Sequence, residues 1–269
     1  MELNVNKSKN NDCAVLVSSC DKYREAWDPF FELFHRFWPQ CPYNVYLNTE
    51  TEQYDKFGVN TINSPGTWGQ RLASTLKKIP SDYIIFLLED FFLQQPVKDD
   101  VIKKCLGYMA ENPNIGCFYF NQIIGYKSEE EDLYEGFFRM YANDEYNDYV
   151  TNCQAALWKK EYLLELVQNS DTPWDFEVEG YKNNKELIDK HEMYCIHTAH
   201  HDKVRACDVF SYVLKRETGC GIWASKWLWN NQKMFKRLGI KVQYKELKVM
   251  TYFEFVIKYK VMPFLKQHI

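Results

Sequence analysis

The chain has 269 residues, a net charge of −4 and 17% aromatic residues. This length is enough for one large α/β domain, and the acidic balance argues against a nucleic-acid partner. The nine cysteines are scattered without a CxxC pair, which indicates reduced thiols in the cytosol and excludes a disulfide framework. Because the first twelve residues are polar and no stretch of about 20 apolar residues occurs, we expect a cytoplasmic protein with neither a signal peptide nor a membrane-spanning helix.

Apolar runs and helical periodicity alternate along the chain. Strands are expected at 12–18, 44–47, 59–62, 83–88, 115–120 and 152–158, and helices at 28–38, 68–79, 99–109, 160–168 and from 173 onward. The run at 83–88 holds no charged residue, which is typical of a strand buried on both faces. Alternating strands and helices predict an α/β fold with a mostly parallel central sheet flanked by helices.

Two adjacent carboxylates, Glu89 and Asp90, follow the most apolar of these strands. Open α/β sheets bind ligands at the carboxyl ends of their strands. Carboxylates among aromatic residues are costly to desolvate unless a cation or hydrogen bonds compensate them. The pair therefore indicates a divalent metal site that holds a phosphate-bearing ligand. The alternative is a strand end whose carboxylates cap the next turn.

Small polar residues follow the first predicted strand in the sequence SSCDKY. Ser18, Ser19 and Asp21 are candidates for contacting a nucleotide at the sheet edge, although the pattern is neither GxGxxG nor a P-loop. Arg71 lies near the start of the helix that begins at Trp68. An arginine there, together with backbone N–H groups, can hold a pyrophosphate. The competing interpretation is a solvated arginine.

The segment TPWDFEVEG has the signals of a short helix that begins at Pro173. Asp175 and Glu177 lie on its first turns, where the helix N-terminus stabilises carboxylates as anions. A general base must be anionic to accept a proton, so either residue is a candidate base. Trp174 supplies a flat wall beside them. The charge pattern alone would also favour the helix without any catalytic role.

The ordered segments AVLVSSCDKY, WGQRLASTL, YIIFLLEDFFL, CQAALWKKEYL and TPWDFEVEG resemble a bacterial GT-A-fold glycosyltransferase. The resemblance covers roughly residues 13 to 227. The enzymes that the chain resembles take part in capsule, exopolysaccharide or lipopolysaccharide synthesis. It implies a GT-A-like single domain that transfers a sugar from a nucleotide-diphosphate sugar, most often a UDP-sugar. The acceptor would be a hydroxyl of a saccharide or a lipid-linked saccharide, and the reaction would be inverting.

The same resemblance assigns roles to individual side chains. Asp90 would bind Mn²⁺ or Mg²⁺ with support from Glu89, although the usual Asp-x-Asp motif here lacks its second Asp. Asp175 or Glu177 would be the general base. The remaining assignments are the nucleotide-sugar contacts Ser18, Ser19, Asp21, Trp68, Arg71 and Glu89, and the acceptor contact Trp174. The rival functions are a sugar nucleotidyltransferase and a non-catalytic saccharide-binding protein.

The last part of the chain differs from the rest in charge. Residues 226–269 contain ten Lys or Arg and two Glu, a local charge of +8 that leaves −12 for residues 1–225. We therefore expect a nucleotide-sugar and acceptor domain over 1–225 and a helical, basic, aromatic extension over 226–269. Such an extension predicts peripheral contact with the inner face of an anionic membrane, unless it packs on the domain with its lysines in water.

Overall fold

The computed structural model describes residues 10–122, 128–134, 136–142, 148–196, 209–212 and 220–258. Within these ranges, one large sheet has the strand order β3-β2-β1-β4-β8-β5-β9-β7-β6. Its strands are β1 (Asn10–Ser18), β2 (Tyr43–Thr49), β3 (Asn60–Asn63), β4 (Tyr83–Leu88), β5 (Ile115–Gln122), β6 (Ser128–Tyr134), β7 (Phe137–Met140), β8 (Ala156–Lys159) and β9 (Glu192–Ile196). Only β7 and β8 among these strands run against the common direction, so the sheet is mostly parallel.

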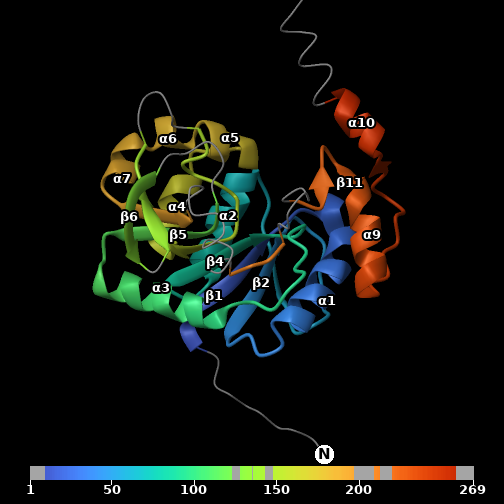
Figure 1. The fold of residues 1–269 in the computed structure, drawn as a ribbon, viewed down its shortest axis with the longest axis horizontal. Helices are drawn as coiled ribbons and strands as arrows, with labels where there is room; N and C mark the ends of the chain where they lie inside the picture. Colours follow the sequence, from blue (N-terminus) through green and yellow to red (C-terminus); the bar gives the residue numbers. More distant parts are fainter. Residues whose placement is uncertain are drawn as a thin grey trace, which may run out of the picture.

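Helices cover both faces of this sheet (Figure 1). The short 3-10 helix η1 (Asp21–Ala26) leads into α1 (Trp27–Phe37), and α1 packs with α3 (Asp99–Glu111) in one apolar core. The opposite core contains α2 (Trp68–Lys78), α4 (Lys160–Val167), α5 (Pro173–Val178), α6 (Gly180–Asn183) and α7 (Lys185–Asp189). In the described ranges, no helix has the length and apolar character needed to cross a membrane.

Strand β4 shows how the sequence directs this arrangement. Ile84 and Phe86 lie in the core with α2 and α4, whereas Ile85 and Leu87 lie in the core with α1 and α3. Side chains alternate between the two faces of a strand, so a strand between two helical layers must be apolar at every position. The uninterrupted apolar run predicted this burial. The predicted fold class, an α/β domain with a mostly parallel central sheet flanked by helices, is confirmed.

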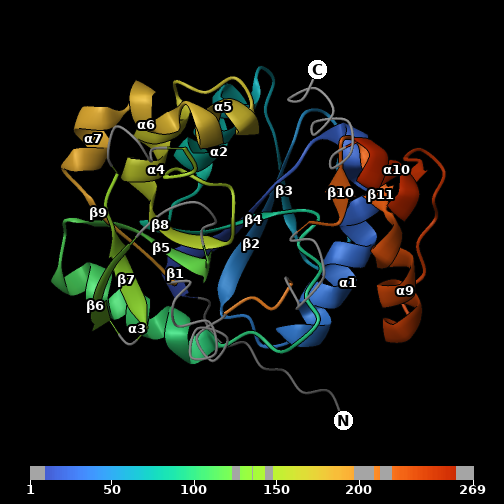
Figure 2. The same cartoon turned by 45° about the horizontal axis from the view of Figure 1, so that its top comes forward.

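A second, smaller unit follows the sheet in the sequence. It consists of the three-stranded sheet β10 (Ile222–Trp223), β11 (Lys226–Leu228) and β12 (Val249–Met250), with α9 (Trp229–Leu238) and α10 (Tyr252–Val256). Figure 2 shows α9 and α10 beside α1, across the molecule from α5 to α7. The extension therefore contains strands as well as the expected helices. The division at 225/226 remains a prediction, and that point lies in the turn between β10 and β11.

The close approach of α2 and α4 depends on Gly69. A Cβ atom at this position would lie 2.2 Å from the carbonyl oxygen of Ser170 and 2.3 Å from that of Val167. We expect Gly69→Ala to lower the free energy of unfolding by about 1–3 kcal/mol, because backbone atoms cannot give way cheaply. Gly107→Ala in α3 is the matched control, since no heavy atom lies within 4 Å of its Cβ position.

The control should instead stabilise the chain by roughly 0.5–1 kcal/mol through helix propensity. Urea unfolding of the two variants and the parent measures both effects. Equal unfolding midpoints for the two alanine variants would contradict this account of the α2–α4 contact.

Candidate active site

The carboxyl ends of β1 and β4 lie side by side in the centre of the sheet. The two strands are parallel and in register, with Ser18 opposite Leu88. The residues that follow, Ser19 and Cys20 on one strand and Glu89 and Asp90 on the other, therefore emerge at the same edge. This is the edge at which open α/β sheets bind their ligands.

Asp90 is buried and is held by the backbone of the C-terminal unit. Its Oδ2 atom accepts hydrogen bonds from the N–H groups of Gly221, at 3.1 Å, and Ile222, at 2.9 Å. Burial raises the pKa of Asp90 to about 6, although these two hydrogen bonds oppose the rise. Gly221 has no room for a side chain, because a Cβ atom would lie 2.1 Å from the Phe92 ring. Gly221 thus allows the backbone to approach the carboxylate.

Glu89 is buried beside Asp90. Burial and the charge of Asp90 raise its pKa well above the ordinary value, while a hydrogen bond from Ser19 and the charge of Arg71 lower it. Two desolvated carboxylates side by side favour the binding of a cation. Among the described residues, no group of three or more His, Cys, Asp and Glu side chains could hold a metal ion. Two carboxylates nevertheless fit Mg²⁺ or Mn²⁺, since such ions keep several waters and take phosphate oxygens as further ligands.

The small polar residues after β1 make internal contacts. Trp68 donates its indole N–H to Ser18 Oγ at 3.2 Å, and Trp27 donates its indole N–H to Ser19 Oγ at 2.8 Å. The Asp21 carboxylate accepts hydrogen bonds from the backbone N–H groups of residues 50 to 52 and so holds the loop after β2. Ser18, Ser19 and Asp21 thus hold the segments around the carboxyl end of β1 in place. Their contact with a nucleotide remains a prediction.

Arg71 lies in the interior, with 7% of its surface exposed. Its guanidinium forms an ion pair with Glu50 and lies 3.5 Å from the Ser19 carbonyl oxygen. Its Nε atom is buried and has no hydrogen-bond partner in the described part of the chain. Arg71 is therefore no solvated surface residue, and its charge acts on Glu89. Trp68, one turn earlier on α2, is also buried and packs against Phe176 at 5.5 Å between ring centres.

The two candidate bases on α5 have different environments. Asp175 accepts hydrogen bonds from the backbone N–H and the hydroxyl of Thr172, both at 2.8 Å, in a capping box. Glu177 is half-buried, and its Oε1 accepts a hydrogen bond from the N–H of Cys153 at 3.0 Å. Burial raises the pKa of Glu177. Asp175 thus stabilises the helix end, and Glu177 is the carboxylate that a site could use.

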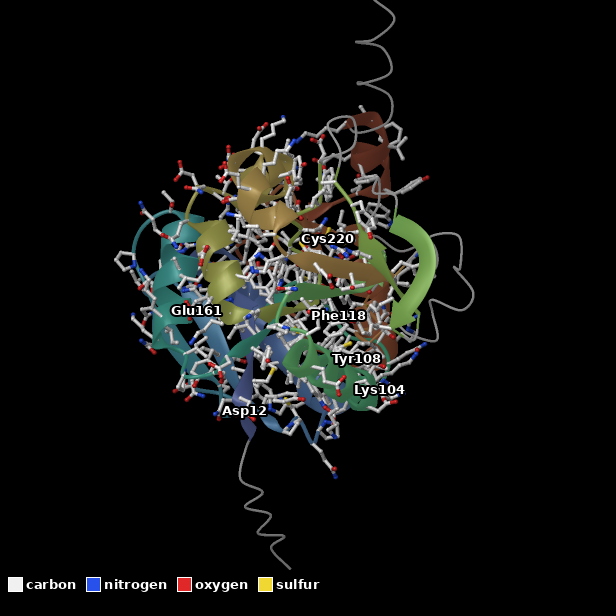
Figure 3. The ribbon with its side chains drawn as sticks, turned by 90° about the vertical axis from the view of Figure 1, so that its left-hand side faces the viewer. Asp12, Lys104, Tyr108, Phe118, Glu161 and Cys220 are labelled. Carbon is white, nitrogen blue, oxygen red and sulfur yellow. The ribbon has the colours of Figure 1, made fainter. Side chains whose placement is uncertain are left out.

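Cys220 connects Glu177 to the acidic pair. Burial and then the charges of Asp90 and Glu177 raise the pKa of the Cys220 thiol well above its ordinary value. Both carboxylates therefore lie close enough to Cys220 to act on it electrostatically. Figure 3 shows Cys220 above Phe118 of β5, on the opposite side of Phe118 from Asp12 at the other end of the sheet. Cys220 directly precedes Gly221, whose N–H group binds Asp90, so this segment lies at the carboxyl end of β4.

Several residues of this region were not predicted from the sequence. The Tyr23 hydroxyl lies 3.3 Å from Ser225 Oγ, and the Lys22 ammonium donates to the same oxygen at 2.7 Å. The charges of Glu89 and Asp90 help to raise the pKa of Tyr23 after the larger effect of burial. Lys22 and Tyr23 lie in the segment SSCDKY, in which only the two serines and Asp21 were predicted to contact a nucleotide. The contact with Ser225 had no signal in the sequence.

No model of a known protein family and no curated protein sequence matches the chain. Solved structures that are similar to the chain include those of three enzymes. The bifunctional IspDF from Campylobacter jejuni has 8% identity and a TM-score of 0.41, over 69% of this chain and 49% of that one. CMP:2-keto-3-deoxy-manno-octonic acid synthetase complexed with CTP has 12% identity and a TM-score of 0.43, over 72% of this chain and 97% of that one.

The third structure is glucosyl-3-phosphoglycerate synthase from Mycobacterium tuberculosis in complex with Mn²⁺, uridine diphosphate and phosphoglyceric acid. It has 10% identity and a TM-score of 0.43, over 69% of this chain and 68% of that one. The chain thus spans about half the length of IspDF and more of the other two enzymes. At TM-scores under 0.5, none of these similarities carries a function over to this chain.

Proposed function

We propose that the chain is a glycosyltransferase that moves a sugar from a nucleotide-diphosphate sugar to a hydroxyl group of a saccharide or lipid-linked saccharide. The observation that supports this most strongly is the buried pair Glu89 and Asp90 at the carboxyl end of β4, where the N–H groups of Gly221 and Ile222 hold Asp90. Glycosyl transfer needs a group that neutralises the diphosphate and a group that accepts a proton. The acidic pair is suited to a metal-bound diphosphate, and the separate, half-buried Glu177 is suited to proton transfer. Surface-polysaccharide synthesis is the process proposed for it.

Asp90 and Glu89 would hold the Mn²⁺ or Mg²⁺ ion. When bound, such an ion neutralises charge on the diphosphate leaving group. The N–H groups of Gly221 and Ile222 fix one oxygen of Asp90, which would hold the carboxylate in place for the ion. The buried charge of Arg71 acts on Glu89 and adds positive potential at the same edge of the sheet.

Glu177 would act as the general base. Its carboxylate accepts the proton of the acceptor hydroxyl as that oxygen attacks the anomeric carbon. The bond from the anomeric carbon to the diphosphate oxygen breaks at the same time, and its electron pair leaves with the nucleoside diphosphate. Attack from the side opposite the leaving group inverts the anomeric configuration. Burial raises the pKa of Glu177 toward neutral pH, which makes its carboxylate a stronger base.

The experiment is a thermal-shift screen of nucleotide sugars and nucleoside triphosphates with and without Mn²⁺, followed by product analysis of every ligand that binds. A ligand that binds only the folded state raises the unfolding temperature. We expect one nucleotide sugar to do so with Mn²⁺, and to release nucleoside diphosphate slowly in the absence of acceptor. Release of pyrophosphate from a nucleoside triphosphate and a sugar phosphate would instead identify a nucleotidyltransferase. Binding without turnover of either substrate would overturn the enzymatic proposal.

A further inference from the structure

Five aromatic rings from four separate elements form a connected row beside the candidate active site. We define the aromatic row as Trp174, Trp223, Phe255, Trp229 and Tyr252. Successive ring centres lie 6.1, 6.4, 5.2 and 5.2 Å apart. The first ring belongs to α5, and the others belong to β10, α9 and α10. The row therefore joins the helical layer over the large sheet to the C-terminal unit.

The two ends of the aromatic row are open to solvent. Trp174 exposes 57% of its surface and Tyr252 exposes 59%, while the neighbouring Phe253 exposes 74%. Other tryptophans of the chain, such as Trp158 and Trp227, are fully buried. Large rings thus fit inside the cores, and the exposed rings of Trp174 and Tyr252 are linked through the three half-buried rings of the row. Grouped exposed apolar surface marks a site of interaction more often than isolated exposed residues do.

The aromatic row begins at the candidate active site. Trp174 precedes Glu177 by three residues on α5, which is about one helical turn. Trp223 directly follows Ile222, whose N–H group binds the Asp90 carboxylate. The first contact of the row, Trp174 with Trp223, thus connects the segment of the proposed base to the segment that holds the acidic pair. From there the row continues to Tyr252 at the N-terminus of α10.

We propose that the aromatic row binds a saccharide chain of several sugar units, and that this chain is the acceptor whose terminal hydroxyl reaches Glu177. This inference rests on the proposed function and specifies its acceptor. Sugar rings have apolar C–H faces and polar edges, and Trp and Tyr side chains likewise combine an apolar face with a polar tip. Glu254 lies on α10 and forms an ion pair with Lys226 of β11, and Ser225 lies in the turn between β10 and β11. These residues supply polar groups for sugar hydroxyls.

A saccharide suits the aromatic row better than a membrane surface does. A membrane would contact the outer side of α10, where Tyr252, Phe253 and Ile257 are exposed. It would not account for the continuation of the row through Trp223 to Trp174 beside the proposed base. A chain of sugars, in contrast, needs a track that leads from the reacting hydroxyl outward. Continuity with the site therefore favours the saccharide.

The test measures binding of the 269-residue chain to an array of bacterial surface glycans, with and without substitutions in the row. Trp174→Ala and Tyr252→Ala are the test variants, since both side chains are largely exposed and their removal leaves the cores intact. Phe57→Ala is the matched control, because Phe57 is 42% exposed and packs against His35 away from the row. For the glycans that bind, solution affinities of the tetrasaccharide and the monosaccharide are then compared by NMR.

We expect the tetrasaccharide to bind more tightly than the monosaccharide, and each test variant to lose roughly tenfold in tetrasaccharide affinity. The Phe57→Ala control should bind like the parent. Equal affinities for the two saccharides, an equal loss in the control, or no binding to any glycan would overturn the inference. If the parent binds anionic vesicles but no glycan, and the test variants lose this vesicle binding, the row would be assigned to a membrane surface. Donor hydrolysis without acceptor is measured separately, so failure of the proposed enzyme activity is distinguishable from failure of the saccharide site.

Discussion

Glu177→Gln is expected to lower the rate of sugar transfer by about 10²–10⁴-fold, the usual contribution of a general base. Glutamine has nearly the shape of glutamate, and its carbonyl oxygen can still accept the hydrogen bond from the Cys153 N–H group. The fold and the binding of the nucleotide sugar should therefore persist. Transfer rates at saturating donor, with a thermal-shift titration of the donor in parallel, separate the loss of proton transfer from any loss of binding.

Asp175→Asn is the matched control for this experiment. Asparagine can still accept hydrogen bonds from Thr172, so we expect little change in transfer rate and at most a loss of roughly 1 kcal/mol in stability at the helix end. The opposite result, an inactive Asp175→Asn variant with an active Glu177→Gln variant, would exchange the two assignments.

The pH profile gives an independent check on Glu177. A base acts only when it is unprotonated, so transfer should increase as pH rises through its pKa. Burial raises that pKa above the ordinary value of 4.5, and the acidic limb of the profile should lie correspondingly above the position for an exposed glutamate. In the Glu177→Gln variant this limb should disappear from the residual activity.

The sequence predicted β4 and the acidic pair because their signal is local. A charge-free run of six apolar residues has few alternatives to a doubly buried strand, and the residues that follow it must lie at the end of the sheet. The same reasoning placed Ser18 and Ser19 at the carboxyl end of the first strand. That β1 and β4 are neighbours in the sheet is a finding of the structure. Local periodicity also placed Trp68 and Arg71 near the start of α2.

The partners of these residues could not be predicted in the same way. Gly221 contacts Asp90 from 131 positions away in the chain, and Glu50 reaches Arg71 from the end of β2. Such contacts depend on how the elements pack, which periodicity does not encode. The choice between Asp175 and Glu177 is similar. Both residues lie on α5. Only the hydrogen bond from the N–H group of Cys153, in the segment before β8, distinguishes Glu177 from Asp175.

Asp90→Asn is expected to stabilise the metal-free protein at neutral pH while it weakens the binding of Mn²⁺. Burial raises the pKa of Asp90 from an ordinary value of 3.8 to about 6 in the folded chain. A difference of this size corresponds to about 3 kcal/mol, because one pKa unit is 1.36 kcal/mol. Asparagine carries no charge to desolvate, and its carbonyl oxygen can still accept from the N–H groups of Gly221 and Ile222.

The pH dependence has a definite sign. Between pH 3.8 and about 6 the folded chain holds the Asp90 proton more tightly than the unfolded chain, so the stability of the parent falls as pH rises. At the lower end of that window the parent and Asp90→Asn should be nearly equal, and above the window the variant should be more stable by about 3 kcal/mol. Urea unfolding in EDTA from pH 4 to pH 8 measures the difference, with the exposed Asp55→Asn as a control that should stay within about 0.5 kcal/mol of the parent.

Addition of Mn²⁺ then tests why a chain would keep a carboxylate that destabilises it. An ion that binds the folded state raises the stability of the parent in proportion to its saturation. The same concentration should have little effect on Asp90→Asn, which lacks the charge that the ion compensates. A variant that is less stable than the parent at pH 8 would show that Asp90 is there to hold Gly221 and Ile222. A more stable variant that has lost its response to Mn²⁺ would show that the desolvated charge is retained for its ligand.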